Sequence, residues 1–523
     1  MKFQGVAKLL PAWKNALLAV VAATLLILAF PDFEIWLLAW FALVPLLWAV
    51  EREKLSVARS FVLGWIFGTV FFFGTCWWLT YAPITYANFP PLFAYFLLIC
   101  VTAIAGLFPG LFTALYGYSL RRLGPVGVLA TPIIWVFSEF SRYWMTGNNW
   151  NALGYSQAFG RSSVLDLAGV GGVYLSGACV VLVSSCLYLV LAYRERPRLK
   201  YIVGAAALAV LLGLFLFDRT VGKSDGPHGM TYVVAIQPNV PMNGLTYEKW
   251  ILVRQEHVAL AESALANITG RQTYHLGPTT VIFPESPMNF TYGEDPEFQQ
   301  FVKAFADGHN VNVLLNSAEP DPENKKYFNS AVLVDTQGKE IAQYDKIYLV
   351  PFGESVPAPL QSIVPAFVGS FSYGKKYDLL PIGEAKAGVM ICFESHFGQL
   401  SREFVRRGAD VLVEMTNDGY LGPTPVLRQH LANAIFRAVE TNRPVLRVTN
   451  VGITAYINER GEVLDPTQSY TEDTRIWTVS RSDGVQTFYV KYGDWLAWLC
   501  TMLTIVLLCF AIVRGTPSGQ TEK

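Results

Sequence analysis

Long uninterrupted apolar runs fill two parts of the chain, and a different pattern lies between them. Residues 1–220 and 491–513 hold nearly all of these runs, whereas 225–490 alternates short apolar and polar stretches as globular proteins do. A helix needs about 20 apolar residues to cross the hydrocarbon core of a bilayer. The pattern therefore predicts about eight membrane spans, at 14–31, 34–50, 60–80, 91–118, 124–144, 163–192, 201–217 and 494–513.

Within 225–490 the apolar period becomes that of strands interleaved with helices. Short β-branched runs ended by polar residues predict strands at 230–237, 279–285, 311–316, 329–335, 387–392, 410–416, 445–449 and 454–458. Helical periods predict helices at 246–266, 296–307, 397–407 and 428–441. Because several strands are apolar on both faces, we expect an α/β domain with a layered sheet core.

Composition and charge favour a membrane protein over a large soluble enzyme. Of the 523 residues, 52% are hydrophobic and 15% are charged, and the net charge is zero. No basic stripe indicates nucleic-acid binding. Lys and Arg gather in alternate connections, at 52–59, 121–122 and 194–200, while 81–90 has none. Since positive connections stay in the cytoplasm, we expect both termini there and the globular segment on the opposite, periplasmic side of a bacterial inner membrane.

One cysteine differs from the other six in its surroundings. Cys392 lies alone in the globular segment, at the end of a predicted strand, while the rest lie in apolar runs. It has no neighbouring cysteine for a CxxC metal or redox site, and no other soluble cysteine for a disulfide. Cys392 is therefore either an inert buried thiol or a nucleophile.

Three short motifs favour the nucleophile. Glu285 follows a strand in Phe-Pro-Glu-Ser, Lys346 and Glu354 share one loop, and Cys392 and Glu394 form Ile-Cys-Phe-Glu. A carboxylate, an ammonium and a thiol at three strand ends can converge above one sheet edge and supply the parts of acyl transfer. Glu285 would take the thiol proton and return it to the leaving group, and Lys346 would hold the oxyanion and favour the thiolate. Glu354 and Glu394 would support the lysine and the local backbone.

These motifs resemble those of the nitrilase, or carbon–nitrogen hydrolase, superfamily, whose Glu-Lys-Cys triad has the same order. The resemblance covers about 230–480 and implies an α-β-β-α sandwich. Such a domain between seven spans and an eighth is similar to that of the apolipoprotein N-acyltransferase family, as are the segments 148–157, 416–422 and 443–452. Gly419 to Gly422 and Phe393 depart from the residues common in that family.

The resemblance implies a reaction in two halves. Cys392 would take an acyl chain from the sn-1 ester of a phospholipid, usually phosphatidylethanolamine, as a thioester. The chain would then pass to the α-amine of diacylglyceryl-cysteine on an apolipoprotein, the last step of bacterial lipoprotein maturation. On this interpretation 1–220 is a seven-span membrane domain, 221–490 a periplasmic nitrilase-like catalytic domain, and 491–523 the last span with a cytoplasmic tail. We expect a monomer without a cofactor.

Further residues are expected to contact substrate or to play no catalytic part. Candidates for substrate binding are Trp250, Phe393, Asn417 and Tyr420. The apolar segments 360–373 and 420–427 are expected to close over the acyl chain.

Other ionisable residues receive a plainer interpretation. His396, four residues after Cys392, suggests a Cys-His dyad, but we expect it to open the next helix and face solvent. The remaining histidines lack ligand spacing, so no metal is predicted. Glu139 and Arg142 interrupt a predicted span near its end, where we expect them to reach the membrane surface.

Two rival interpretations stay open. One is a membrane-tethered amidase or nitrile hydrolase acting on a soluble substrate, for which eight spans are more than a tether needs. The other is a transporter or scaffold carrying an inactive hydrolase domain. Against it, the three motifs are complete and the spans lack the broken helices typical of transporters.

Overall fold

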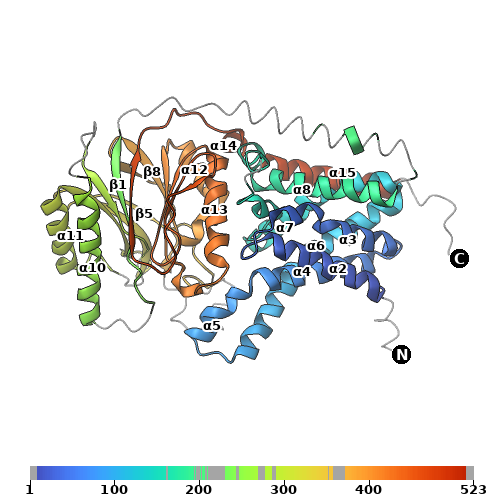
Figure 1. Cartoon of the computed structure of the whole chain (residues 1–523), viewed down its shortest axis with the longest axis horizontal. Helices are drawn as coiled ribbons and strands as arrows, with labels where there is room; N and C mark the ends of the chain where they lie inside the picture. Colours follow the sequence, from blue (N-terminus) through green and yellow to red (C-terminus); the bar gives the residue numbers. More distant parts are fainter. Residues whose placement is uncertain are drawn as a thin grey trace. The chain divides into compact units, whose positions relative to one another are not determined.

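The chain forms two compact units, Met1–Gly222 with Tyr492–Lys523, and Lys223–Lys491, and each is described here by itself (Figure 1). The computed structural model describes residues 9–160, 163–193, 195, 201, 203–205, 209, 230–242, 247–268, 277–285, 290–351, 353–356 and 371–513.

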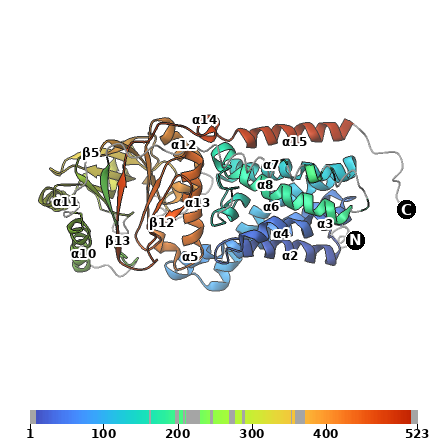
Figure 2. The ribbon, with the colours of Figure 1, turned by 45° about the horizontal axis from the view of Figure 1, so that its top comes forward.

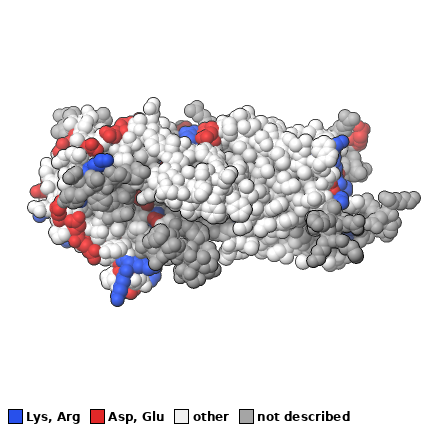
Figure 3. All heavy atoms as spheres, turned by 90° about the horizontal axis from the view of Figure 1, so that it is seen from below, with Lys and Arg blue, Asp and Glu red and all other residues white. Residues whose placement is uncertain are grey.

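The first unit is built from helices that run side by side (Figure 2). Its main helices are α2 (Trp13–Ala29), α3 (Ala39–Glu53), α4 (Val57–Thr75), α6 (Pro91–Leu123), α7 (Thr131–Thr146), α8 (Ala168–Ala192) and α15 (Trp495–Val513). Small residues bring α4 and α6 together: a Cβ on Gly64 would lie 2.1 Å from the Thr113 Oγ1 atom. The visible face of this unit is almost wholly free of charge, with Lys and Arg gathered at one end (Figure 3). Leu92, Phe93 and Phe96 of α6 are among its exposed apolar side chains. Such an exterior suits a lipid environment.

The length and apolar character of these helices can be compared with the eight predicted membrane spans. Within the described part of the chain, three helical stretches are long and apolar enough to cross a membrane: Val57–Thr75, Pro91–Thr146 and Ala168–Ala192. Trp13–Ala29 and Trp495–Phe510 are shorter apolar helices. The helical membrane region is therefore confirmed, but the number of eight spans is not. Most of the predicted span 201–217 lies outside the described residues.

Glu139 and Arg142 do not reach the surface as expected. Both are buried, at 7% and 6% exposure. Glu139 accepts a hydrogen bond from the Leu153 N–H (2.8 Å), and Arg142 donates to the Trp150 carbonyl (2.9 Å). These charges turn inward because the Leu153 N–H and the Trp150 carbonyl, in the segment after α7, need partners away from water.

The second unit is a sandwich of two sheets (Figure 1). In the first sheet the strand order is β13-β1-β2-β3-β4-β5, with β6 beside β4, and in the second it is β12-β11-β10-β9-β8-β7. The strands of the first sheet are β1 (Thr231–Gln237), β2 (Thr279–Ile282), β3 (Val311–Asp321), β4 (Lys326–Val334), β5 (Glu340–Asp345), β6 (Phe371–Ser372) and β13 (Asp473–Val479). Those of the second are β7 (Leu379–Ile382), β8 (Ala385–Ile391), β9 (Val411–Thr416), β10 (Val445–Thr449), β11 (Ala455–Ile457) and β12 (Val463–Leu464).

Helices cover both outer faces of this sandwich. The helices α10 (Tyr247–Ala266) and α11 (Pro296–His309) pack on the first sheet, and α12 (Gly398–Arg406) and α13 (Val426–Thr441) pack on the second. A short helix, α14 (Phe488–Tyr492), ends the unit. The sheets meet through β1 with β10 and β4 with β8. The predicted α-β-β-α sandwich is thus confirmed, and β1, β9 and β10 are buried along their whole length because both of their faces are covered.

Among the described residues, five strands were missing from the sequence prediction, and two of them, β6 and β12, have only two residues each. β5 is largely polar, β7 contains a proline at a sheet edge, and β13 mixes polar and apolar residues. β13 pairs antiparallel with β1 from a position more than 230 residues later in the chain, for example Asp473 with Gln237. Edge strands bury only one face and carry a weak apolar signal.

Strand direction brings the chemically active motifs together. β2 runs parallel to β3, and β5 is antiparallel to β4, which is antiparallel to β3, so β2 and β5 end at the same edge. In the second sheet β8 and β9 are parallel. Glu285 and Lys346 follow the first pair of strands, and Cys392 and Asn417 follow the second.

Gly374 allows a close approach beside the lysine loop and gives a test of this packing. A Cβ at residue 374 would lie 2.0 Å from the Asp345 carbonyl oxygen, while the Gly374 N–H donates to the Lys346 carbonyl. We expect Gly374→Ala to lower the free energy of unfolding by about 1–3 kcal/mol through overpacking. Gly308→Ala is the matched control, because a Cβ there meets nothing within 4 Å. Thermal melting of both purified variants checks this, and equal melting temperatures would contradict it.

Candidate active site

Cys392 opens a short turn at the end of β8. It begins the 3-10 helix Cys392–His396 and has φ of 52°, in the left-handed region that non-glycine residues seldom occupy. The side chain is partly exposed. Burial among protein atoms raises the pKa of the Cys392 thiol, and the negative charge of Glu285 adds to this, while Lys346 opposes it. The thiol is therefore protonated at neutral pH.

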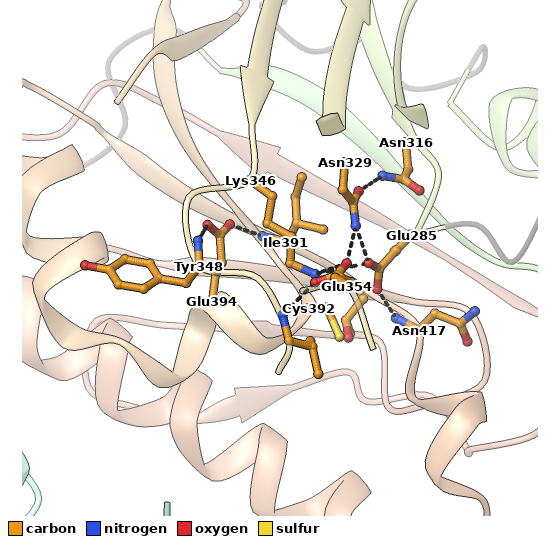
Figure 4. Close-up of polar contacts among 12 residues, drawn as sticks. Glu285, Asn316, Asn329, Lys346, Tyr348, Glu354, Ile391, Cys392, Glu394 and Asn417 are labelled. Atoms are coloured by element: carbon orange, nitrogen blue, oxygen red, sulfur yellow. Dashed lines mark hydrogen bonds and ion pairs between the residues drawn. The ribbon is translucent and has the colours of Figure 1, made fainter. Parts of the chain in front are cut away.

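Lys346 is the buried cation of the site (Figure 4). Its side chain is 0% exposed, and its Nζ atom lies 2.8 Å from Glu354 Oε1 and 3.5 Å from Glu285 Oε1. Burial alone would lower the pKa of Lys346, but the two carboxylates outweigh it and raise that pKa above its ordinary value. For Glu354, burial alone would raise the pKa, but the attraction of Lys346 is stronger and brings that pKa below its ordinary value. The ammonium and the Glu354 carboxylate are both charged.

Two asparagines, which the sequence analysis did not single out, hold the carboxylates in place. Asn329 Nδ2 donates to Glu285 Oε1 (3.0 Å) and to Glu354 Oε1 (2.7 Å). Asn316 Nδ2 donates to Asn329 Oδ1 (2.7 Å), which fixes the orientation of the amide. The available signal was asparagine inside β-strands, where that residue is uncommon.

Glu394 ties the lysine loop to the nucleophile turn. Its Oε1 atom accepts from the Tyr344 hydroxyl (2.8 Å), the Ile347 N–H (2.7 Å) and the Tyr348 N–H (3.0 Å). Its Oε2 atom accepts from the Ile391 N–H (2.8 Å). Burial raises the pKa of Glu394 to about 7. Four donors on one side chain lock the backbone on either side of Lys346 and before Cys392.

The predicted substrate contacts fall in different surroundings. Asn417 is buried, and its N–H donates to Glu285 Oε2 (3.2 Å), so both Glu285 oxygens have partners. Phe393 stacks against His396, and Tyr420 is 48% exposed. Trp250 belongs to α10, but its side chain lies outside the described residues, as does the segment 357–370, which includes most of the predicted lid.

His396 does not face solvent as expected. It is 1% exposed, because the turn after Cys392 continues through it and folds its ring between Phe393 and Phe397. Its carbonyl accepts from Arg437 (2.9 Å). Among the described residues, no three His, Cys, Asp or Glu side chains are grouped so as to hold a metal ion.

An apolar cavity opens beside Glu285. Its lining includes Phe283, Phe290, Phe301 and Leu315, with Glu285 at one side. Its walls are almost wholly apolar.

Comparison with known proteins identifies the family. The Apolipoprotein N-acyltransferase N-terminal domain matches residues 22–186, and the Carbon-nitrogen hydrolase family matches 255–489. The Apolipoprotein N-acyltransferase of Geobacter metallireducens is 31% identical over 521 residues, which cover 97% of each chain. The chain belongs to the apolipoprotein N-acyltransferase family. It is therefore an acyltransferase built on the carbon–nitrogen hydrolase fold.

Members from other bacteria are similar over comparable lengths. The Apolipoprotein N-acyltransferase of Thermotoga maritima is 28% identical over 95% of this chain and 94% of its own. Among solved structures, Saccharomyces cerevisiae Nit3, a member of branch 10 of the nitrilase superfamily, aligns with 49% of this chain and 93% of its own, at 17% identity and a TM-score of 0.36.

Asn329 gives a test of how the carboxylates are held. We expect Asn329→Ala to lower the turnover rate about 10–100-fold, because Glu285 and Glu354 lose a shared donor that fixes their positions. Asn324→Ala is the matched control, since Asn324 is exposed and its side chain donates to Asp321 in the same turn. Steady-state assays of the two variants check this. Equal turnover in both would show that Asn329 has no positioning role.

Proposed function

We propose that this protein transfers an acyl chain from a phospholipid to the N-terminal amine of diacylglyceryl-cysteine on apolipoproteins, through a thioester on Cys392. The observation that carries the proposal is the cluster of Glu285, Lys346 and Cys392, in a chain that matches named apolipoprotein N-acyltransferases over nearly its whole length. Glu285, Lys346 and Cys392 are the proposed catalytic residues, and Glu354 and Glu394 their supports.

The first half-reaction begins from the neutral thiol. Cys392 Sγ attacks the ester carbonyl while Glu285 takes the thiol proton, and Lys346 stabilises the oxyanion of the tetrahedral intermediate. The intermediate collapses with loss of the lysophospholipid alkoxide, which takes the proton from Glu285. The products are a thioester and a lysophospholipid, so atoms and charge balance.

In the second half-reaction, the same groups act again, and Cys392 is now the leaving group. The α-amine attacks the thioester carbonyl, Glu285 accepts the amine proton, and the Cys392 thiolate departs. Glu285 then returns that proton to the sulfur, which regenerates the enzyme and leaves an amide. A nucleophile whose resting form is the thiol suits this cycle, because Glu285 starts each half-reaction as a free base.

Two features favour a lipid acyl donor over a soluble amide. The helical unit has an apolar exterior, and the cavity beside Glu285 is lined by aromatic and aliphatic side chains. A membrane-tethered amidase or nitrile hydrolase needs neither feature. Phosphatidylethanolamine is the proposed donor, and Trp250, Phe393, Asn417 and Tyr420 are the proposed substrate contacts.

The proposed topology follows from the distribution of Lys and Arg. We place 221–490 in the periplasm as the catalytic domain, 1–220 and the helix within 491–523 in the inner membrane, and both termini in the cytoplasm. The acting species is proposed to be a monomer, since every group of the cluster comes from one chain.

The thioester can be detected directly. We expect intact-protein and peptide mass spectrometry, after incubation with phosphatidylethanolamine, to find a fatty-acyl adduct on Cys392 that hydroxylamine removes. Cys392→Ala should carry no adduct, and Cys392→Ser should turn over at least about 100-fold more slowly, because a serine hydroxyl ionises far less readily. Cys509→Ala, outside the sandwich, is the matched control. An adduct that persists in Cys392→Ala would overturn the proposal.

Reporter fusions test the topology. Alkaline phosphatase inserted after Asp483, on an exposed connection of the catalytic unit, should be active, because this reporter folds only in the periplasm. A green fluorescent protein fused after Lys523 should fluoresce in the cytoplasm. An inactive phosphatase at the first position, with the fusion protein intact in membranes, would reverse the assignment.

A further inference from the structure

A buried cluster of four charged side chains lies behind the nucleophile turn, and none of them takes part in the proposed chemistry. Glu414 of β9, Asp418 of the following 3-10 helix Asp418–Leu421, His430 of α13 and Arg447 of β10 are each at most 4% exposed. Arg447 pairs with Glu414 (2.5 Å) and with Asp418 (2.8 Å). Two carboxylates so placed need two cations if the cluster is to be neutral, and the second is His430.

His430 connects this cluster to Cys392. Its Nδ1 atom lies 2.7 Å from Asp418 Oδ1, and its Nε2 atom lies 3.0 Å from the carbonyl oxygen of Cys392. Nε2 is also 3.0 Å from Glu414 Oε1. All three neighbours are acceptors, so both ring nitrogens must carry protons for these contacts to be favourable.

The electrostatics agree with a charged ring. Burial alone would lower the pKa of His430, and Arg447 also opposes a second cation. The attraction of Asp418 and Glu414 outweighs both and raises that pKa to about 9. Arg447 and His430 in turn hold the pKa of Asp418 below its usual range and bring that of Glu414 to about 2, although burial raises both.

We propose that His430 is a positioning residue, whose Nε2–H holds the Cys392 carbonyl so that the thiol faces Glu285 and Lys346. The left-handed backbone of Cys392 costs free energy for a residue with a Cβ, and such a conformation persists only where its surroundings impose it. Glu394 fixes the N–H before Cys392, and His430 fixes the carbonyl of Cys392 itself. The Ser395 hydroxyl also donates to that carbonyl, at the longer distance of 3.4 Å.

Two neutral replacements separate positioning from charge. The amide nitrogen of glutamine falls where Nε2 lies, so His430→Gln keeps a donor for the Cys392 carbonyl. The amide nitrogen of asparagine falls where Nδ1 lies, so His430→Asn keeps only the contact with Asp418. Both remove the same charge from the same buried cluster. A role in charge balance alone affects both alike, whereas positioning affects the asparagine variant more.

The first readout is the rate at which iodoacetamide alkylates Cys392 in the full-length detergent-solubilised enzyme, followed by peptide mass spectrometry. The second is the rate of lysophospholipid release from phosphatidylethanolamine. We expect His430→Asn to lower both rates about 10–100-fold with KM within about twofold, and His430→Gln to stay within about fivefold of the natural enzyme. Equal rates in the two variants would overturn the proposal. The kinetic readout rests on the proposed function, but alkylation does not, so failure of the natural enzyme to release lysophospholipid counts against the function alone.

Asp418→Asn provides a second test that leaves His430 in place, should His430→Asn fail to fold. Without Asp418 the pKa of His430 falls, so the ring loses its second proton at a lower pH, while Glu414, Arg447 and the Cys392 carbonyl still face it. The asparagine amide can donate to Nδ1, so the neutral ring keeps its remaining proton on Nε2, where the Cys392 carbonyl accepts it. Positioning therefore predicts an alkylation rate within about fivefold of the natural enzyme at both pH 6 and pH 8. A rate that falls more than about tenfold relative to the natural enzyme between these pH values would show that the charge of the ring matters rather than its Nε2–H, and would overturn the proposal.

Discussion

The buried ammonium of Lys346 is the constraint on which the site depends. A charge with no exposed surface is stable only if charged and hydrogen-bonded partners surround it. Glu354 and Glu285 supply the charges, and Asn329 then supplies a donor that keeps these two carboxylates together. Because Glu285 follows β2 and Lys346 follows β5, this requirement fixes where two separate strands of one sheet must end. The fold and the site are therefore set by the same ion pairs.

The cation does not make the nucleophile a resting thiolate. Lys346 lowers the pKa of Cys392, but burial and Glu285 raise it further, so the balance favours the thiol. The effect of Lys346 has the direction that the sequence analysis expected, but burial and Glu285 outweigh it. Glu354 already balances the positive charge of Lys346. In the proposed mechanism, the ammonium therefore acts chiefly on the oxyanion that forms during the reaction. In the proposed mechanism, Glu285 therefore transfers the proton and Lys346 stabilises the developing charge.

The sequence predicted those parts of the fold that local patterns encode, and it predicted that Glu285 and Lys346 lie together. Strands buried on both faces, such as β1 and β9, carry long β-branched runs, and Glu285, Lys346 and Cys392 stand in recognisable motifs. The polar strand β5 and the distant pairing of β13 with β1 left no such pattern. Asn329 and His430 were missed for a related reason. Their importance depends on which side chains the tertiary structure brings to them, and each lies in an element whose sequence looks ordinary. His396 was placed in solvent because a helix start was expected where the turn after Cys392 continues.

Cys392 lies between two charge clusters of different kinds. On one side, Lys346 with Glu285 and Glu354 carries an excess of one negative charge, which the proton shuttled by Glu285 can offset during turnover. On the other side, Glu414, Asp418, His430 and Arg447 balance to zero, and each charge has an opposite partner within 3.0 Å. A neutral and fully buried cluster resists rearrangement, because separating any of its pairs leaves an unmatched charge away from water. In the proposed mechanism, the cluster of Lys346, Glu285 and Glu354 can therefore change its protonation in each half-reaction while the backbone that carries the sulfur stays fixed.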